Sequence, residues 1–540
     1  MKTLTKFISA AFAVLIFAMS AVTANGGPLP TPRPRPTPAP RPTPPLTADI
    51  GSSYTNSKVP YSIDPTAILT AIGHNPSRGI FGGYSDLNGD GIPDVVFTFI
   101  SGQPTEGLPI IIACGQPGGS YVDCTTQIIP GEVPAGVDPR KILVADFNGD
   151  GWPDIFIADT GYDAPPYSGY HNWLLLSDGT GHLVYQSALA NIDPVGFHHG
   201  ATAGAIDHSG HIDIFVPEDS NTSHYFLLND GQGHFTVDTT RVPPTTNLSN
   251  IYACELIDVD NDGNLDLIVG GTECGDLPTQ IFWGDGTGFY SDANKTALPP
   301  ECAWNVVLDI DAEDINHDGL RDLVITRTND YSGFYFQVLM QTSPRVFADE
   351  SLPRLIHDLS TWIGNNAPWV IWIHLVDMTG DGSPDIVLDD TASFEGGSNG
   401  LGWANDGNGF FTFTGGWLKV IWTTPLVGGT FSPPAPGIYS YDLNWNEPVD
   451  PASVQPTDLT LSGIQGATVT GVAVINGNLT TEFTLDIPTG GSLTASIAAG
   501  AINSQYSHPN VAFSGNYPVS PWVPRPSPTP RLHPTPPPRS

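Results

Sequence analysis

Short apolar runs occur in pairs along much of this 540-residue chain, and an acidic segment separates the members of each pair. Ile142–Ala145 and 370–373 are two runs that precede such a segment. Runs of this kind, rich in β-branched residues and bounded by turn residues, are typical of buried strands. Each pair therefore predicts a β-hairpin whose turn is the acidic segment. The runs that follow the acidic segments are 95–97, 155–157, 267–269, 323–325 and 386–388.

A second polar phrase, Asp-Gly-x-Gly, follows many of these hairpins and again lies between apolar residues. Residues 225–228 precede one copy, and Phe235 follows it. Asp-Gly between apolar segments is a strong signal for a tight hairpin turn. The chain thus repeats two hairpins, or four strands, in roughly 50–60 residues, which is what one blade of a β-propeller needs. The copies are 177–181, 229–233, 284–288 and 405–409.

The five acidic segments share one pattern: Asp at position 1, Asp, Asn or Thr at 3, Asp at 5, Gly at 6 and Asp at 9. Gly allows the sharp turn that brings these side-chain oxygens together. An all-oxygen set of ligands suits Ca²⁺ better than Zn²⁺. We expect about five structural Ca²⁺ ions, each also bound by a backbone carbonyl near position 7. The predicted metal ligands are Asp86, Asn88, Asp90, Asp94, Asp146, Asn148, Asp150, Asp154, Asp258, Asp260, Asp262, Asp266, Asp314, Asn316, Asp318, Asp322, Asp377, Thr379, Asp381 and Asp385.

These loops are not EF-hands. An EF-hand closes its ion with an acidic residue at position 12 of the loop. Position 12 is apolar in all five segments, and it lies in the strand that follows the loop. The EF-hand and dockerin-like interpretations are therefore excluded.

The acidic loop together with the later Asn-Asp-Gly-x-Gly-x-Phe turn resembles the FG-GAP/VCBS repeats of bacterial secreted proteins and of integrin α-subunit heads. The resemblance covers about residues 75–420. It implies a β-propeller with Ca²⁺ in the loop between the first and second strands of each blade. It implies less about function, because such propellers serve adhesion, carbohydrate binding and scaffolding alike.

A sixth, degenerate copy of the loop extends from Asp207 to Asp213 and is followed by the apolar run 214–216. It reads as two residues short and has no central Asp-Gly, so we expect no calcium there. Residues 47–75 offer strands for a seventh blade, the number that the resemblance favours. The expected fold class is all-β: a six- or seven-bladed β-propeller with calcium loops over 47–426, followed by a small β-sandwich.

The pattern changes after residue 426. Segments such as 467–474 and 481–485 alternate small polar with apolar residues, and Gly, Pro and Asn separate them. Several short strands of this kind predict a small β-sandwich over 427–516. The stretch 447–461 resembles the Ig-like modules that are appended to bacterial secreted proteins.

The two ends of the chain indicate export. Residues 1–24 combine Lys2 and Lys6 with an apolar stretch and a small-residue cleavage pattern, which is typical of a secretory signal peptide. The Pro-rich segments 25–46 and 517–540 cannot form a core and predict extended linkers. We expect a secreted or cell-surface-associated monomer without a transmembrane segment.

The charge of the chain is strongly segregated. The formal net charge is −36, and all 55 acidic residues lie within 47–516, whereas 8 of the 19 basic residues lie in the terminal segments. An acidic body makes nucleic acid or an anionic membrane an unfavourable partner. Five bound Ca²⁺ ions would reduce the repulsion within this body.

The five cysteines all lie in the exported part of the chain. Cys114 and Cys124 flank the predicted outer hairpin of the first blade and could form a local disulfide. Cys254, Cys274 and Cys302 leave one residue unpaired, and spacing alone does not say which one.

Catalytic motifs are sparse. The string 396–400 fits G-x-S-x-G but has no strand-to-helix elbow around it. His198–His199 and the pair of His208 and His211 suggest a transition-metal site, but the second pair flanks the degenerate calcium loop, which favours a solvated turn with replaced ligands. Trp304, Trp362, Trp369, Trp372 and Trp403 are either packing residues or part of a sugar-stacking platform.

Two function classes remain open from the sequence. The first is a non-catalytic secreted adhesion or ligand-binding module, with structural Ca²⁺ in the blade loops and a glycan or protein as ligand. The alternative is an extracellular polysaccharide-active enzyme, a lyase or hydrolase, that uses a propeller cleft. A central cleft with a cluster of His, Arg, Tyr or Lys would favour the enzyme.

Overall fold

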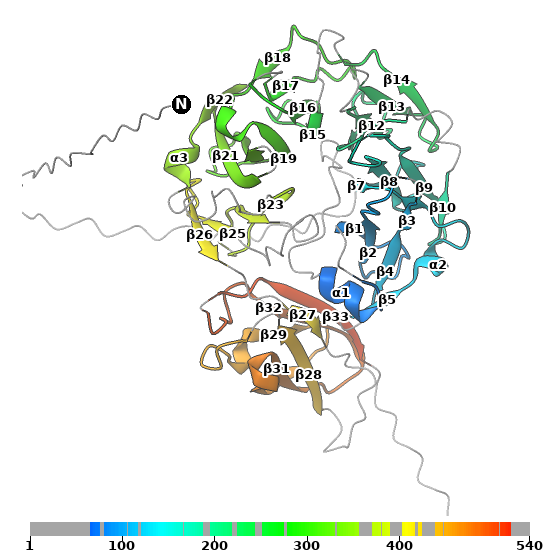
Figure 1. The fold of residues 1–540 in the computed structure, drawn as a ribbon. Helices are drawn as coiled ribbons and strands as arrows, with labels where there is room; N and C mark the ends of the chain where they lie inside the picture. The colour runs from blue at the N-terminus through cyan, green and yellow to red at the C-terminus, as the bar shows by residue number, and fades with distance from the viewer. Residues whose placement is uncertain are drawn as a thin grey trace, which may run out of the picture. The chain divides into compact units, whose positions relative to one another are not determined.

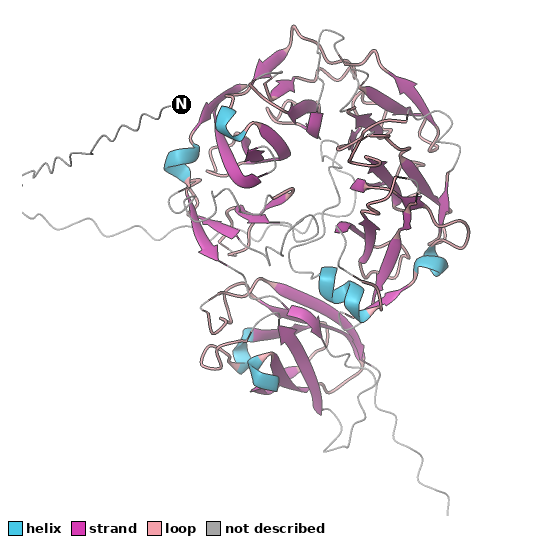
Figure 2. Ribbon diagram, viewed as in Figure 1, coloured by secondary structure: helices cyan, strands magenta, loops and turns pink. Residues whose placement is uncertain are grey.

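The computed structural model describes residues 65–519 apart from 76–79, 105, 117–119, 166, 187–194, 219–223, 243–250, 275–277, 330–331, 356–369, 380, 389–401, 416–419, 424–437, 446–447 and 507. Strands dominate this part of the chain, and its helices are short (Figure 2). Among the described residues, no helix is long and apolar enough to cross a membrane. The expected signal peptide, the Pro-rich segment 25–46, residues 520–540 of the Pro-rich tail and the G-x-S-x-G string lie outside the described residues, whereas residues 517–519 of the tail belong to strand β33 (Phe513–Val519).

Residues 80–415 form six four-stranded antiparallel sheets that follow one another in chain order (Figure 1). Each sheet is built from successive strands, except that β3 is skipped in the first. This repetition is consistent with the propeller-like fold that the sequence predicts. The strands are β1 (Ile80–Ser85), β2 (Asp94–Phe99), β4 (Ile111–Gly115) and β5 (Tyr121–Asp123); β7 (Pro139–Ala145), β8 (Asp154–Asp159), β9 (Trp173–Ser177) and β10 (Leu183–Tyr185); β11 (Thr202–Gly204), β12 (Asp213–Val216), β13 (Tyr225–Asn229) and β14 (Phe235–Asp238); β15 (Ile251–Ile257), β16 (Asp266–Gly271), β17 (Gln280–Phe282) and β18 (Lys295–Ala297); β19 (Val306–Glu313), β20 (Asp322–Asn329), β21 (Ser332–Ser343) and β22 (Val346–Asp349); and β23 (Ile373–Val376), β24 (Asp385–Leu388), β25 (Gly402–Asn405) and β26 (Phe411–Gly415).

The second strand of every sheet is buried on both faces because neighbouring sheets pack against each other. One core cluster joins Val96 and Ile112 of the first sheet to Ile142 and Ile155 of the second. Further clusters join each later sheet to the next one. This double burial explains why the predicted strands are continuous apolar runs rather than alternating ones.

The first and sixth sheets are also in contact. Phe81 of β1 meets Trp372, which directly precedes β23, with ring centroids 5.3 Å apart. The same two residues share a small core cluster with Ile371.

Residues 65–75 contain a helix where the sequence offered strands of a seventh blade. Helix α1 (Pro65–Ala71) buries Ile68 and Leu69 against the first sheet. The other short elements are α2 (Thr125–Ile128), α3 (Ser351–Arg354), the 3-10 turn η2 (Cys302–Trp304), and the two-stranded pair β3 (Leu108–Pro109) and β6 (Ala135–Gly136).

The C-terminal part forms two antiparallel sheets that share one core. The hydroxyls of Tyr441 and Tyr517, one from each sheet, lie 2.6 Å apart. Strand β27 belongs to this part although it precedes the boundary expected at 426. The first sheet contains β27 (Val420–Thr423), β28 (Ile438–Trp445), β31 (Thr480–Asp486) and β30 (Thr468–Ile475), and the second contains β29 (Leu459–Ser462), β32 (Gly491–Ile497) and β33 (Phe513–Val519); η4 (Pro456–Asp458) and η5 (Asn476–Asn478) connect strands.

Candidate functional site

The six acidic loops all connect the first and second strands of a sheet with the same register. Ser85 pairs with Asp94 across the first loop, and Ala145 pairs with Asp154 across the second. Position 6 is a glycine with positive φ, as at Gly91 (83°). A side chain at this φ is sterically unfavourable, which explains the invariant glycine of the pattern.

The position 1 carboxylate holds the loop backbone together. Asp86 Oδ1 accepts hydrogen bonds from the N–H groups of Gly89 and Asp90, and its Oδ2 accepts from Gly91 N–H at 2.8 Å. The same pattern recurs at Asp146. These bonds order the loop and fix the direction in which the other carboxylates point.

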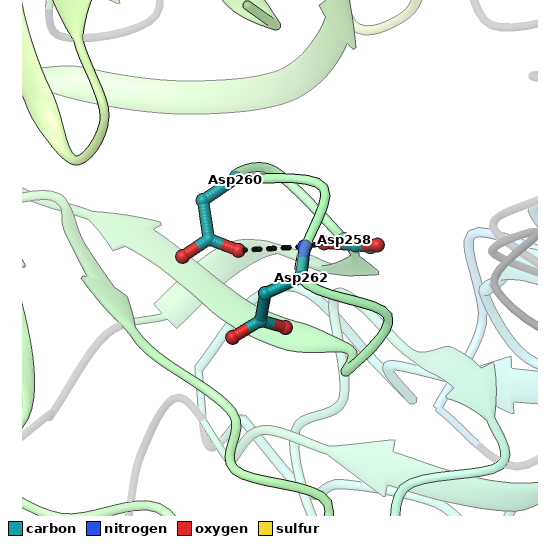
Figure 3. A group of neighbouring side chains, drawn as sticks. All are labelled: Asp258, Asp260 and Asp262. Atoms are coloured by element: carbon teal, nitrogen blue, oxygen red, sulfur yellow. Dashed lines mark hydrogen bonds between the residues drawn. The ribbon is translucent and has the colours of Figure 1, made fainter.

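Positions 3 and 5 present oxygen atoms at the partly exposed side of the loop. Asn88 Oδ1 accepts from Asp90 N–H, and Asp90 Oδ1 accepts from Ile92 N–H, each at 2.8 Å. In loop 258–266, one carboxylate oxygen each of Asp258, Asp260 and Asp262 lie within 4.8 Å of one another (Figure 3). All donor atoms are oxygens, so the residues present fit a hard divalent cation such as Ca²⁺.

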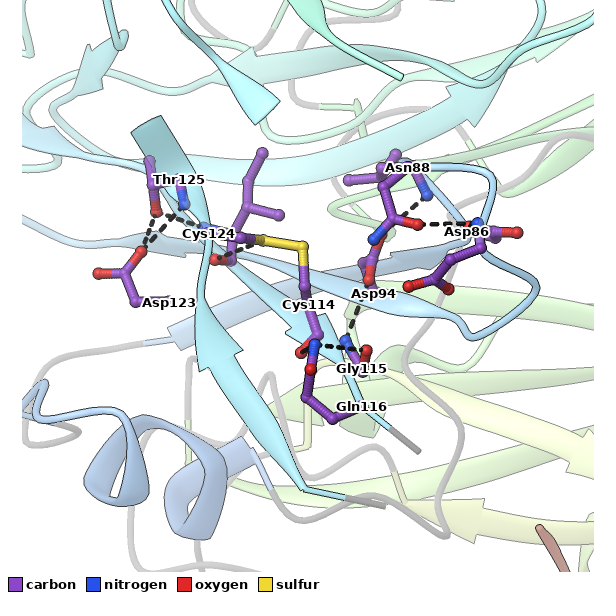
Figure 4. Close-up of a disulfide and its surroundings, with 12 residues drawn as sticks. Asp86, Asn88, Asp94, Cys114, Gly115, Gln116, Asp123, Cys124 and Thr125 are labelled. Carbon is purple, nitrogen blue, oxygen red and sulfur yellow. Dashed lines mark hydrogen bonds between the residues drawn. A yellow bond between two sulfur atoms is a disulfide. The ribbon is translucent and has the colours of Figure 1, made fainter. Parts of the chain in front are cut away.

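Position 9 is the most buried part of each loop. Asp94 is fully buried: its Oδ2 accepts from Leu87 N–H at 2.9 Å, and its Oδ1 accepts from Gly115 N–H of the third strand at 3.0 Å (Figure 4). A carboxylate oxygen has two lone pairs, so each oxygen keeps one for a further partner. Position 9 therefore anchors the loop to its sheet as well as serving as a predicted ligand.

Burial raises the pKa of every position 9 carboxyl in the described loops. The pKa of Asp94 rises to about 6 and that of Asp154 to about 7, despite the backbone N–H groups that lower both. Nearby loop carboxylates contribute to the increase, as Asp150 does for Asp154. A negative charge at position 9 is thus unfavourable unless a cation lies close by.

The degenerate sixth loop is not shortened, which corrects the sequence alignment. Gly204 pairs with Asp213 in the register of the other hairpins, so position 1 is Ala205 and Asp207 stands at position 3. Position 6 is Gly210 with φ of 82°. Oδ2 of the buried Asp213 has no hydrogen-bond partner among the described residues, whereas the equivalent oxygen of Asp94 has one. The loop has lost the carboxylates of positions 1 and 5 rather than residues.

A pocket lies at the opposite ends of the same inner strands. Residues at or just before the start of the innermost strand of all six sheets line a cavity of about 30 Å³, which has room for a water-sized group. Lys141 lies near the start of β7, whereas the acidic loop follows the end of this strand. Because a strand rises roughly 3.3 Å per residue, the pocket and the loop are well separated. The lining residues are Phe81, Arg140, Lys141, His199, Tyr252, Leu308, Ile371 and Trp372.

Lys141 is buried in this pocket with few partners. Its Nζ lies 3.5 Å from Glu255 Oε1 and 5.6 Å from the centre of the Trp372 ring. Among the described residues, the Glu255 contact is the single hydrogen bond of Nζ, and an ammonium group has three donors. The ammonium can therefore donate to a group that enters the cavity.

Arg140 and His199 give the pocket a second cation and a neutral ring. Arg140 donates two hydrogen bonds to Asp138 and one to Asp163, which fixes its guanidinium. Burial, with the Arg140 charge second, lowers the pKa of His199 well below its usual value. His199 also contacts the ring of Tyr252 at 5.1 Å.

The other sequence candidates are placed as follows. His198 is buried against Asn172 and Tyr225, and burial lowers its pKa to about 3. His208 contacts Asn264. Trp372 lines the pocket and Trp403 lies in the core between the last two sheets, whereas Trp362 and Trp369 fall outside the described residues.

The sequence did not reveal the pocket because its residues lie at or just before the start of six strands that are distant from one another in the chain. A usable signal was present: Arg140 and Lys141 are adjacent cations in a body with few basic residues, and they directly precede the apolar run 142–145. The cysteine pairs are Cys114–Cys124, which the spacing suggested, and Cys274–Cys302, with Cys254 buried as a free thiol.

Comparison with protein families matches the model of the FG-GAP-like repeat four times, at residues 86–157, 146–216, 206–269 and 258–325. Residues 86–325 are FG-GAP-like repeats. Each match extends from one acidic loop to the strand after the next loop, and the third begins in the degenerate copy. FG-GAP-like repeats suggest a ligand-binding or adhesion-type β-propeller domain. A search of the curated proteins found no match.

Proposed function

We propose that this chain is a secreted, non-catalytic ligand-binding or adhesion module that recognises an extracellular glycan or protein. The observation that carries the proposal is the convergence of all six inner strands on one pocket. Ligand sites form where several elements bring a few polar groups into an apolar surround. Here Lys141 and Arg140 are the polar groups, and Phe81 and Trp372 form part of the apolar surround.

The size of the cavity limits the part of a ligand that enters it. A cavity of about 30 Å³ accommodates an end group of a ligand, such as a hydroxyl or carboxylate. The remainder of the ligand would then lie on nearby loops. Tyr167 is 53% exposed and contacts Phe197, which in turn contacts His199 of the pocket. These aromatic rings provide a surface on which a sugar or an apolar side chain can stack.

Calcium has a structural role in this proposal. The five intact loops would hold about five ions through positions 1, 3, 5 and 9, at the ends of the inner strands that are distant from the pocket. A catalytic ion needs an open coordination position beside the substrate. The placement of the loops therefore favours ions that stabilise the sheets rather than ions that react.

Secretion and the C-terminal module complete the proposal. The signal-peptide pattern at 1–24 and the Pro-rich segments support an exported module on extended linkers. Two sheets around one core at the C-terminal end are compatible with an Ig-like module, which would act as a spacer or second attachment domain.

One observation favours the enzymatic alternative. The pocket brings together Arg140, Lys141, His199 and Tyr252, which are residue types that abstract protons and neutralise carboxylates in polysaccharide lyases. Arg140 and Lys141 both pair with acidic side chains, which favours a role in binding over a role in proton abstraction. Incubation with uronate polysaccharides tests the alternative, because a lyase would produce an unsaturated product with strong ultraviolet absorbance.

Binding to an array of glycans and extracellular proteins tests the proposed function. We expect the mature chain to bind at least one class of ligand, and Tyr252→Ala to reduce that binding at least tenfold by removing one wall of the pocket. Tyr506→Ala, which changes a 64% exposed tyrosine in the segment between β32 and β33, is the matched control and should bind as the unchanged protein does. If both variants bound the ligand equally well, the ligand site would lie outside the pocket. If the protein formed an unsaturated product from the polysaccharides, it would be a lyase and the binding proposal would be wrong.

A further inference from the structure

The turn between the third and fourth strands differs in the fifth sheet. In the other sheets with an Asp-Gly-x-Gly turn, the second glycine has positive φ, as at Gly233 (77°). Gln341 N–H donates to Asp322 Oδ1 in the way that Asn229 N–H donates to Asp213 Oδ1, which aligns the two turns. This alignment places Arg345, with φ of 67°, at the position of the second glycine.

This turn position lies against the acidic loop of the preceding sheet. A Cβ atom on Gly181 would lie 3.1 Å from the carbonyl oxygen of Asn88, and one on Gly233 would lie 3.4 Å from Asn148 Cβ. Asn88 and Asn148 both stand at position 3 of their loops. In the second, third and fourth sheets, therefore, a bare glycine faces position 3 of the neighbouring loop, and the turn contributes no side chain to the loop from there.

Arg345 instead places a guanidinium in loop 258–266. Its Nε donates to Asp260 Oδ2 at 2.5 Å, and its Nη2 donates to Asp262 Oδ2 at 3.3 Å. Its Nη1 donates to Asn294 Oδ1, and its guanidinium carbon lies 4.7 Å from the centre of the Trp283 ring. The guanidinium thus binds the carboxylates of positions 3 and 5 and is held in place from two other sides.

An aspartate at position 3 is accompanied by an arginine in this chain. The position 3 residue is asparagine in three loops and Thr379 in a fourth, so it carries no charge there that a cation would balance. The two loops with Asp at position 3 both have an ion pair with an arginine: Asp260 with Arg345, and Asp207 with Arg241 at 4.0 Å. The extra carboxylate and its balancing cation occur together.

We propose that the guanidinium of Arg345 takes the place of a divalent ion in loop 258–266. This loop then keeps its shape without a divalent ion and binds Ca²⁺ only when the guanidinium is displaced. The proposal rests on the proposed calcium role of the other loops and reduces the expected number of ions from five to four. A bound guanidinium occupies lone pairs that Ca²⁺ needs, and its positive charge repels the ion. Calcium affinity at this loop should be at least tenfold lower than at loop 146–154.

Calorimetric calcium titration of Arg345→Gly tests the proposal. Glycine tolerates the positive φ and restores the residue found at this turn in other sheets, so the backbone need not change. The unchanged protein should bind four ions with high affinity, and the variant should bind five. Arg354→Gly is the matched control: Arg354 also reaches a turn carbonyl, that of Asn408, but pairs with Glu350 rather than with a loop carboxylate, and this variant should keep four sites.

Hydrogen exchange on the unchanged protein provides a test that needs no variant. The N–H of Gly263 donates to Asp258, and the N–H of Gly151 makes the equivalent bond to Asp146. Chelation should accelerate exchange at Gly151 but leave exchange at Gly263 unchanged. Five tight sites in the unchanged protein, or equal acceleration at both amides, would overturn the role of Arg345 and leave the calcium proposal intact. Zero sites in every protein would overturn both.

Discussion

At the scale of single residues, the acidic loops combine two kinds of carboxylate that the sequence pattern does not distinguish. Asp90 at position 5 is exposed and accepts a hydrogen bond from the N–H two residues later. Asp94 at position 9 is fully buried and accepts hydrogen bonds from a backbone N–H of the loop and from one of the third strand. The first kind is available to an ion, and the second is part of the sheet. Substitutions at the two positions should therefore have different consequences.

Asp94→Asn should destabilise the protein even when no divalent ion is present. Asparagine has one acceptor oxygen, so its amide NH₂ group would face the N–H of Leu87 or of Gly115, and a buried donor would remain unsatisfied. We expect a loss of about 1–3 kcal/mol in the free energy of unfolding. Urea denaturation in chelator measures this loss. The matched Asp90→Asn should have the same free energy of unfolding as the unchanged protein in chelator. It should be less stable than the unchanged protein only when both are measured with Ca²⁺.

At the scale of the secondary-structure elements, much of the first hairpin of each sheet could be predicted from the sequence. The apolar runs 155–157 and 386–388 lie within β8 and β24, and the acidic segments connect the strands as expected. The prediction succeeded because two-sided burial and a tight turn leave local patterns. The alignment of the sixth loop is wrong because Ala205 and Ser209 replace aspartates, so that the first aspartate of the loop is Asp207 and the copy reads as two residues short.

The outer hairpins and the contacts between sheets were less predictable. Arg345 does not resemble a glycine in sequence, and only the hydrogen-bond register of its sheet reveals their equivalence. The same limit applies to the pocket, since Lys141 and Trp372 meet through the stacking of sheets that are distant in the chain. Such contacts depend on three-dimensional neighbours, for which a single sequence has no local pattern.

The position 9 carboxyls should also make the stability of the ion-free protein depend on pH. Burial raises their pKa values in the folded state to about 6 for Asp94 and Asp385 and to about 7 for Asp154, Asp266 and Asp322, above the value of an unfolded aspartate. Between about pH 4 and 7 the folded state then binds more protons than the unfolded state, so the free energy of unfolding falls as pH rises.

Urea denaturation in chelator at pH 5 and at pH 8 tests this dependence. We expect greater stability at pH 5, and a smaller difference when Ca²⁺ is present because a bound cation favours the charged carboxylates. Equal stability at both pH values in chelator would show that these groups titrate normally.

At the scale of the whole molecule, the acidic composition and the loops together predict a strong response to chelation. The chain has a formal net charge of −36, and its loops concentrate carboxylates at one end of the inner strands. Ions that bind only the folded state stabilise it by about 2.7 kcal/mol per site at a hundredfold excess over Kd. Several sites therefore have a large combined effect.

Chelation should lower the melting temperature by many degrees, and ligand binding should decline together with the folded fraction. Calorimetric melting with and without Ca²⁺, followed by a binding assay over the same temperatures, measures both quantities. A melting curve that did not change with chelator, combined with lost binding, would instead place an ion in direct contact with the ligand.

The pairing of Asp260 with Arg345 also limits how such a chain can evolve by copying its repeats. Junctions in which Asn faces Gly are interchangeable, so a repeat that carries them can be duplicated or deleted with little electrostatic penalty. The Asp260–Arg345 junction is different because its two charges belong to neighbouring repeats. Duplication or loss of one of these repeats alone would leave an aspartate or an arginine without its counterpart, so the two must be inherited together.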